Sequence, residues 1–294
     1  MTNKNALDEL RREIDKIDDA IHDLLMRRAQ VVERVGAQKG GAGPYIRPGR
    51  EAVILRRLMA RHVGPLPAAV VVRMWRELIT ALTRLQGPFA VAVYAPEDRR
   101  GFWDVARDHY GGVAPLTAVN SPQAAVRAVS EGAATIGVVP CPAEDDADPW
   151  WRFLVNADQR TPRIIARLPF GGRGNARGED RDALAVALVD PEPTGDDRAL
   201  LGVELGADLS RGRLKDALEA AGLPPVSFCT WHAPGQQGYS VHLVEVADFV
   251  DRADPRVGLL SQRLNAALEE ANGYARVNVL GGYAVPLDLP YDHR

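Results

Sequence analysis

The chain has 294 residues, of which 46% are hydrophobic and 26% are charged, and this composition excludes a chain that is mainly disordered. Its 36 basic and 39 acidic residues give a formal charge of −3, which argues against a polybasic protein that binds nucleic acid. The length suits two or three domains, and the two cysteines, Cys141 and Cys229, are too few for a secreted disulfide scaffold.

The beginning of the chain predicts neither a signal peptide nor a membrane anchor. Residues 1–23 are rich in charge and contain no apolar core of the kind that a signal peptide needs. No stretch approaches the roughly 20 consecutive apolar residues that cross a bilayer. We therefore expect a cytoplasmic protein with no membrane partner.

A single long helix is predicted over residues 6–38, which hold no proline and only one glycine. At 1.5 Å per residue this helix would be roughly 50 Å long, which is more than a small domain needs to cover its own core. We therefore expect a partner that covers the apolar seam along this helix. The apolar residues of this seam recur at steps of three and four: Leu7, Leu10, Ile14, Ile17, Ile21, Leu24, Val31 and Val35.

Two further helices are predicted before the chain changes character. Glycines and a proline end the long helix, after which residues 50–63 and 67–86 fit a second and a third helix. A Gly-Pro pair at 87–88 then marks a boundary, so residues 1–87 are predicted to form an all-α domain. The inward face of the third helix is expected to carry Val71, Met74, Leu78, Leu82 and Leu85.

Strands and helices alternate in residues 88–182. This alternation predicts a small parallel α/β layer. The Gly-rich and charged stretch 171–183 is predicted to be a flexible linker. The expected strands are residues 89–94, 134–139 and 163–168, and the expected helices are residues 102–110 and 122–131.

A third domain is predicted over residues 183–294. A strand at 184–189 is expected to lead into it, and the following order of elements, βαββαβ, is that of a ferredoxin-like sandwich. This fold hosts many tasks, so the order alone does not indicate a function. The expected strands are residues 199–204, 226–231, 239–246 and 276–280, and the expected helices are residues 211–221 and 254–271.

Basic charge concentrates in residues 1–86, which contain 16 Lys and Arg but only 10 Asp and Glu. Written as heptads, the seam puts Arg28 in a core position and places Arg11 and Lys39 on the row beside it. A buried guanidinium needs a carboxylate, either from the protein or from a ligand. A structural pair with a nearby acid such as Asp15 or Asp18 would account for Arg11 alone. Three cations on one face favour an anion-binding pocket.

Three stretches of the first segment carry a resemblance. They are LDELRREIDKIDDAIHDLLMRRAQVVERVGAQK, the pair Arg50-Glu51 and WRELITALTRLQ. Together they resemble the all-helical (type II) chorismate mutases that are fused to prephenate dehydratase in bacterial bifunctional proteins. The resemblance implies an intertwined homodimer whose long first helix crosses into the partner. It also implies an isomerase of phenylalanine and tyrosine biosynthesis that converts chorismate to prephenate with no cofactor and no metal.

The roles of the basic residues follow from the same resemblance. The reaction is a pericyclic rearrangement, so catalysis must come from holding the folded conformer and from electrostatic stabilisation. Arg11 of the partner subunit and Arg28 would bind the two carboxylates of chorismate, for which the guanidinium fork is suited. Lys39 and Gln86 would donate to the ether oxygen as its C–O bond breaks.

The far end of the substrate would be held by Arg50 and by Glu51, with Glu51 accepting from the ring hydroxyl. The chain departs from the family pattern close to this end. The family has an acid shortly before the Arg-Glu pair, where this chain has Arg47-Pro48-Gly49. The family has a small hydroxyl residue one turn before the glutamine, where this chain has Leu82. Both changes predict altered substrate orientation and leave the central cations in place.

The rest of the chain resembles the other part of those bifunctional proteins. AVAVYAPEDRR and AVRAVSEGAATIGVVP are similar to prephenate dehydratase strands, and residues 183–294 resemble its regulatory ACT domain. The catalytic motifs of the dehydratase are replaced, so we interpret this region as an inactive, shortened remnant. The replacements are Asp98-Arg99-Arg100 for Gly-Thr-aromatic-Ser, Cys141-Pro142-Ala143 for Glu-Asn-Ser, and Asp182-Ala183-Leu184 for Thr-Arg-Phe.

The sequence thus favours a chorismate mutase with an inactive dehydratase-like region. Two alternatives remain open. One is a bifunctional enzyme that also converts prephenate to phenylpyruvate. The other is a non-catalytic protein that senses an amino acid through its ACT-like domain and uses the helices only to dimerise, although Arg28 and Lys39 would serve such a dimer poorly. The two cysteines and six histidines have no metal-ligand spacing.

Overall fold

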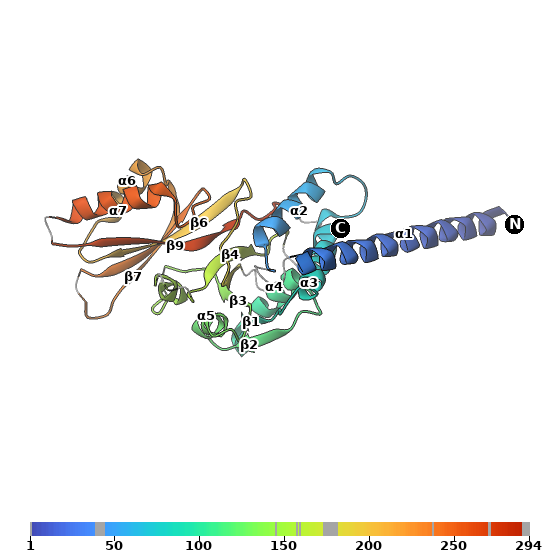
Figure 1. Ribbon diagram of the computed structural model, residues 1–294, viewed down its shortest axis with the longest axis horizontal. Coiled ribbons are helices and arrows are strands. Elements are labelled where there is room, and N and C mark those ends of the chain that lie inside the picture. The colour runs from blue at the N-terminus through green and yellow to red at the C-terminus, as the bar shows by residue number, and fades with distance from the viewer. Residues whose placement is uncertain are drawn as a thin grey trace.

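A long helix projects from a body built on a single mixed sheet (Figure 1). The computed structural model describes residues 2–38, 45–144, 146–156, 158, 160–172, 182–236, 238–269 and 272–289. The N-terminal helices lie at one end of the body, and a C-terminal pair of helices lies against the other end of the sheet (Figure 1). Within the described part of the chain, no helix combines the length and the apolar character that crossing a bilayer requires.

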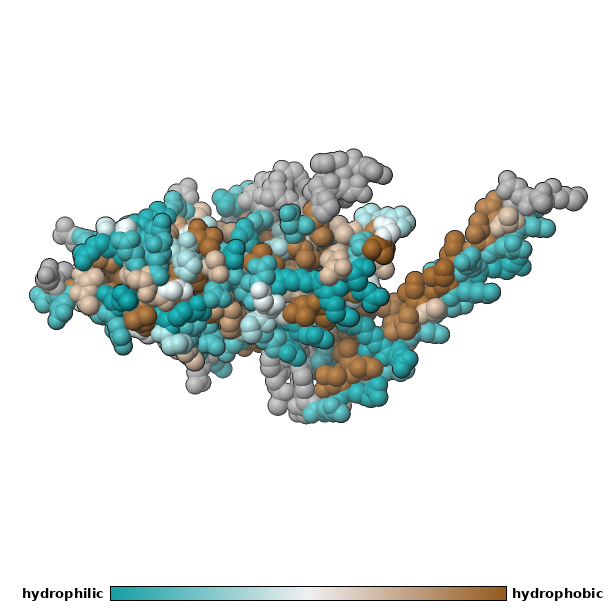
Figure 2. All heavy atoms as spheres, turned by 90° about the horizontal axis from the view of Figure 1, so that it is seen from above, coloured by the Kyte–Doolittle hydropathy of each residue, from teal (hydrophilic) through white to brown (hydrophobic). Residues whose placement is uncertain are grey.

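The projecting helix is α1 (Thr2–Gln38), and it confirms the predicted long helix. Its apolar seam is uncovered in a single chain, and Figure 2 shows it as a brown stripe along the helix. Such a stripe is normally covered by another protein surface. The large apolar side chains of α1 that are 42% to 64% exposed are Leu7, Leu10, Ile14, Ile17, Ile21, Leu24, Met26, Val31 and Val35.

The other two predicted helices are present as α2 (Pro48–Ala60) and α3 (Ala68–Arg84). The predicted inward face of α3 is wrong in part, because Met74 and Leu85 are 52% and 56% exposed. The reason is that α3 packs against α4 (Gly101–Tyr110) of the next region as well as against α2. The side chains that these contacts bury are Val72, Arg76, Ile79, Thr80, Leu82 and Thr83.

The predicted parallel α/β layer begins the body. Its first strand, β1 (Val91–Tyr94), lies between two parallel neighbours, β2 (Leu116–Val119) and β3 (Ile136–Pro140). Helix α4 connects β1 to β2, and α5 (Pro122–Ser130) connects β2 to β3. The sequence did not predict β2, which is a four-residue strand at the edge of the sheet.

Two antiparallel strands extend this layer. They are β4 (Arg163–Leu168) and β5 (Ala183–Ala187), and β5 lies between β3 and β4. The expectation that this strand leads into the last domain is therefore wrong, because β5 is paired inside the α/β layer. All five of its residues are buried, as a central position in a sheet requires. Two short 3-10 helices, η1 (Glu97–Arg99) and η2 (Trp150–Leu154), complete the described elements of this region.

The C-terminal elements confirm the βαββαβ prediction. Four antiparallel strands lie in the order β9-β6-β8-β7, and α6 and α7 bury their apolar faces against this part of the sheet. This order is ferredoxin-like. The elements are β6 (Asp197–Leu205), α6 (Arg211–Ala220), β7 (Pro225–His232), β8 (Ser240–Val246), α7 (Pro255–Leu268) and β9 (Ala275–Ala284).

The two parts of the sheet join through β4 and β9, which run parallel with Ile164 opposite Gly281. Gly281 has a φ of +130°, and a Cβ at this position would collide with the backbone of Ile164. Glycine is the residue that allows this close approach. The described strands therefore form one sheet in the order β2-β1-β3-β5-β4-β9-β6-β8-β7.

A buried histidine in β8 makes stability depend on pH. The Nδ1 atom of His242 lies 3.0 Å from Thr230 Oγ1, and its Nε2 atom lies 3.0 Å from Ser240 Oγ. Burial, helped by the charges of His232 and Arg211, lowers the pKa of His242 from 6.5 to about 4. Between these pH values the unfolded chain binds a proton that the folded chain does not, so stability is lost as the pH falls.

We expect this histidine to account for about 2 kcal/mol of the unfolding free energy that is lost between pH 6.5 and about pH 5. Urea unfolding at both pH values checks this. The variant His242→Gln should lose about that much less than the parent chain. His22→Gln, at an exposed position of α1, serves as the control and should behave as the parent does. Equal losses in the parent and in His242→Gln would contradict the prediction.

Candidate active site

The last third of α1 lies against the body, and Arg28 is on the face that does so. Gly36 lies next to Gln86 at the end of the helix, where a Cβ would be in ordinary van der Waals contact, 3.4 Å from Cγ of Gln86. Gln86 follows α3 and donates from Nε2 to the carbonyl of Leu82, at 3.4 Å. The partly buried residues of this face of α1 are Leu25, Arg28, Ala29, Val32 and Gly36.

The Arg28 guanidinium lacks an acceptor. Its Nη1 atom is buried, and no described residue offers it a hydrogen bond. Burial also lowers the pKa of Arg28, with no carboxylate to oppose the shift. An unpaired buried donor of a charged group is costly to the fold. Among the described residues, Arg28 therefore has an unfilled donor that suits an anion.

Of the other predicted basic residues, Arg11 pairs with an acid of its own helix. Arg11 is 71% exposed, and its Nη1 atom lies 3.1 Å from Asp8 Oδ1. The nearby acid that pairs with Arg11 is thus Asp8, and not Asp15 or Asp18 as the structural alternative suggested. Arg50 is exposed on α2. Lys39 lies outside the described residues.

Glu51 is held in a buried ion pair that the sequence did not predict. Its Oε2 atom accepts from Arg76 Nη1 at 2.6 Å, and the two side chains are 17% and 6% exposed. The Arg76 guanidinium also lies 5.1 Å from the centre of the Phe170 ring. Burial raises the pKa of Glu51, and Arg76 opposes this shift. The Glu51 carboxylate is therefore fixed in position by Arg76 of α3.

Arg47 and Gly49, which replace the acidic position of the family pattern, contact the loop that follows β5. Arg47 donates to Glu192 from Nη2 at 2.7 Å and from Nε at 3.1 Å. A Cβ on Gly49 would lie 2.8 Å from the carbonyl oxygen of Glu192, so only glycine fits here without a shift. Arg56, about two helix turns further on, donates to Thr194 Oγ1 at 2.7 Å. The departure from the family pattern is thus part of an interface between α2 and the body.

The positions of the replaced dehydratase motifs hold structural groups. Asp182 accepts from Arg167 Nη2 at 2.7 Å, across neighbouring strands. Burial raises the pKa of the Cys141 thiol to about 12, so it is protonated at neutral pH and is a poor nucleophile. Cys141 supplies no carboxylate where the resemblance has a glutamate, and Asp182 supplies no hydroxyl where it has a threonine.

Comparison with known families identifies the helical part. Residues 10–87 match the model of the family described as chorismate mutase type II. These helices are a chorismate mutase domain. A bifunctional chorismate mutase/prephenate dehydratase from Pseudomonas aeruginosa is 34% identical over 147 residues, which are 48% of this chain and 40% of that relative. The chain therefore spans less than half of the relative's length. The aligned stretch is longer than the part of the chain that matches the family model.

Two solved structures are similar to part of the chain at low identity. GqqA, described as a novel type of quorum quenching acylases, is 15% identical with a TM-score of 0.48 and covers 69% of this chain and 97% of its own. A prephenate dehydratase from Arthrobacter aurescens in complex with L-Phe is 14% identical with a TM-score of 0.47 and covers 68% of this chain and 93% of its own. TM-scores below 0.5 do not by themselves assign a function.

Proposed function

We propose that the chain is a chorismate mutase that rearranges chorismate to prephenate. The observation that supports this most is the half-buried Arg28, whose Nη1 atom lacks an acceptor within a chorismate mutase domain. A carboxylate of chorismate would supply two acceptor oxygens to this guanidinium in the geometry that it prefers. The energy of that contact would fix the folded conformer in which the new bond forms.

The remaining residues of the proposed site act on the reacting atoms without transferring a proton. Gln86 lies at the end of α3 next to α1, where its amide group can donate to the ether oxygen. Lys39, one residue after the described part of α1, would add a positive charge at the same oxygen. Both donors act on negative charge that develops only as the C–O bond breaks, so they favour the transition state over the substrate. Arg50 and Glu51 on α2 would orient the far end of the ring.

We propose that the active unit is a homodimer. Arg11 and Arg28 are on the same helix, and at 1.5 Å per residue they are roughly 25 Å apart, too far to bind one small substrate together. A second copy packed along the apolar seam of α1 would bring Arg11 of the partner subunit to Arg28. The same packing would cover the exposed stripe (Figure 2).

The seam gives a direct test of the dimer. The double variant Ile14→Glu/Ile17→Glu places two charges at seam positions that are 56% and 51% exposed in one chain. It should be monomeric by analytical ultracentrifugation and should lose mutase activity, because each site would lack the partner's Arg11. Lys16→Glu, a charge change at an exposed position of α1 outside the seam, should remain dimeric and active. A dimeric double variant with full activity would overturn the proposed assembly.

The function itself is tested by following chorismate absorbance with the purified full-length chain and identifying the product. Formation of prephenate is the expected result. A folded dimer that consumes no chorismate would favour the non-catalytic sensor. Prephenate is also to be offered as substrate at neutral pH, and we expect no phenylpyruvate, because Asp182 and Cys141 stand where the dehydratase motifs would be. Enzyme-dependent phenylpyruvate would establish the bifunctional alternative.

A further inference from the structure

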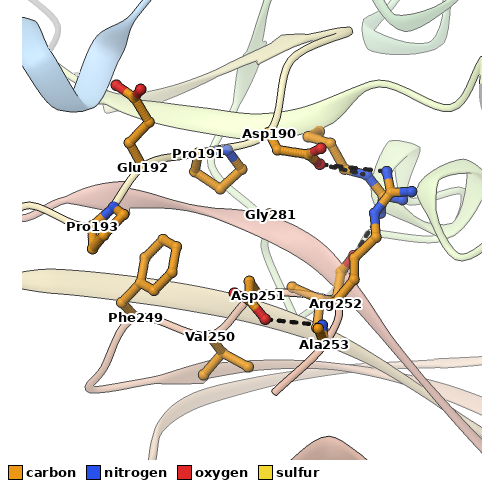
Figure 3. A pocket seen from close by; sticks show the side chains of 12 residues that line it. Asp190, Pro191, Glu192, Pro193, Phe249, Val250, Asp251, Arg252, Ala253 and Gly281 are labelled. Carbon is orange, nitrogen blue, oxygen red and sulfur yellow. Dashed lines mark hydrogen bonds and ion pairs between the residues drawn. The ribbon is translucent and has the colours of Figure 1, made fainter.

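A second cavity lies away from the proposed mutase site, at the junction of the two parts of the sheet (Figure 3). Its volume of about 430 Å³ is within the range of small-molecule sites. The loop after β5 forms one wall with Pro191 and Pro193, and the loop between β8 and α7 forms the opposite wall with Phe249 and Val250. In Figure 3 the Phe249 and proline rings lie around the same space. The walls therefore offer an apolar surface.

A buried arginine of β4 lines this cavity. Arg163 is 5% exposed, and its Nη1 atom donates to the carbonyl of Val279 at 2.5 Å. Its Nε atom is buried and has no hydrogen-bond partner among the described residues. The carboxylate of Asp190 is 4.0 Å from this Nε atom, which is beyond hydrogen-bond distance, and lies 3.5 Å from Nη2 of Arg252. Two guanidinium groups thus face the cavity around one carboxylate that is 74% exposed.

The charge of the expected ligand follows from which polar groups of this cavity lack a partner. Arg163 has an unpaired donor, and guanidinium groups bind carboxylates in preference to neutral acceptors. Each carboxylate of the lining already has a donor or a cation beside it. Asp190 lies between the two arginines, Asp251 accepts from the amide of Ala253 at 2.9 Å, and Glu192 is bound by Arg47. The cavity therefore has an unsatisfied donor for an anion, while each of its carboxylates already has a donor or a cation.

We propose that this cavity binds a small organic acid whose carboxylate contacts Arg163 and Arg252 and whose apolar body packs against Phe249 and Val250. The bound carboxylate takes the place of the exposed Asp190 side chain and satisfies Arg163 Nε. Apolar contact area and a few convergent polar groups are the usual components of such sites.

The cavity also connects to the mutase domain through one loop. Glu192 and Thr194 follow Asp190 directly, and they are the residues that Arg47 and Arg56 of the α2 segment bind. A ligand that displaces Asp190 therefore acts on the loop that holds α2, and α2 carries Arg50 and Glu51. On the proposed function, we infer that the acid changes the KM for chorismate, because these two residues orient the substrate.

Binding is tested by calorimetry on the full-length chain with 3-phenylpropanoate as the probe. Its neutral counterpart, 3-phenylpropan-1-ol, should bind at least about tenfold more weakly. L-Phenylalanine, which adds an ammonium group to the same body, should also bind more weakly, and tighter binding of phenylalanine would overturn the assignment to a simple acid. Equal binding of the acid and the alcohol would overturn the carboxylate site.

Variants locate the site. Arg163→Met and Arg252→Ala should each weaken binding of the probe about tenfold, and Arg252→Ala removes a half-exposed side chain, so its fold should be intact. Arg263→Ala, an exposed arginine of α7, is the matched control and should bind as the parent does. Unchanged binding in Arg252→Ala would overturn the proposal even if Arg163→Met failed to fold.

The coupling is tested by measuring the KM for chorismate with and without the probe. We expect a change in the parent and none in Glu192→Gln, which weakens the link to Arg47. Binding without any change in KM would overturn the coupling. A chain that binds the probe but does not consume chorismate would refute the proposed function and would still support the binding site.

Discussion

Replacing Arg28 by leucine should lower kcat/KM for chorismate about 100-fold or more while the unfolding free energy stays the same or rises. The loss follows because the guanidinium would make two charge-assisted hydrogen bonds to a substrate carboxylate. The unfolding free energy should not fall, because leucine would remove a buried donor that no described residue satisfies and would fit the apolar face of α1. A binding residue and a structural residue differ in this respect, since a structural pair would lose stability on substitution.

Steady-state kinetics and urea unfolding on the same protein sample check both halves of this prediction. Arg27→Leu is the matched control, because Arg27 is the adjacent residue and is exposed. It should change neither quantity by more than a small amount. A large fall in stability of Arg28→Leu would show that Arg28 has a structural partner. Full activity would remove Arg28 from the substrate site.

Replacing Arg76 by methionine should cost about 3 kcal/mol of unfolding free energy or more. The substitution would leave the Glu51 carboxylate buried without its cation, at a position where burial already raises the pKa of this group. It would also remove the contact between the guanidinium and the Phe170 ring, which joins α3 to the chain segment after β4. Loss of one partner of a buried pair is more damaging than loss of both.

Denaturant unfolding tests this second prediction with two further variants. Arg57→Met, at an exposed position of α2, should have almost no effect. The double variant Glu51→Leu/Arg76→Met should be more stable than Arg76→Met alone, because no charge is left unpaired. If Arg76→Met cost less than about 1 kcal/mol, the pair would be behaving as an exposed ion pair does.

The parts of the fold that could be predicted from the sequence are those in which the local pattern and the final environment agree. The seam of α1 is periodic apart from Arg28, so the helix could be predicted, whereas the partner that would cover the seam stays a prediction. The buried face of α3 could not. Arg76, Thr80 and Thr83 are polar, and they are buried because α4 and the chain near Phe170 pack against them. Periodicity alone assigns such residues to solvent.

The pairing of the strands was the other feature of the fold that could not be predicted from the sequence. The five buried residues of β5 were predicted to be a strand, but its place between β3 and β4 depends on partners far away in the sequence. The strand β2 has only four residues and lies at an edge, so it gave too little alternation to detect. The order of the C-terminal elements was predictable because each of them is long and clearly bounded.

For the candidate site, the sequence placed Arg28 among apolar positions of the long helix, and Arg28 is partly buried there, whereas its role in binding stays a prediction. The sequence interpreted Arg47 and Gly49 only as a loss of substrate contacts. The structure gives these two residues a separate task, since both contact Glu192, and Arg47 and Glu192 are 145 positions apart along the chain. Spacing along the sequence carries no information about such a contact. The roles of Glu192 and of Gly49 opposite it follow only from the contact between them.

The exposed seam of α1 also has a consequence during synthesis of the chain. This helix leaves the ribosome before the sheet exists, and at common elongation rates the rest of the chain follows over a time on the order of tens of seconds. During that interval an uncovered apolar stripe is available to chaperones, to unrelated nascent chains, or to the same helix on a neighbouring ribosome of one messenger RNA. Pairing of two nascent copies would bury the stripe before either body has folded, so assembly of this protein would precede the folding of its larger part.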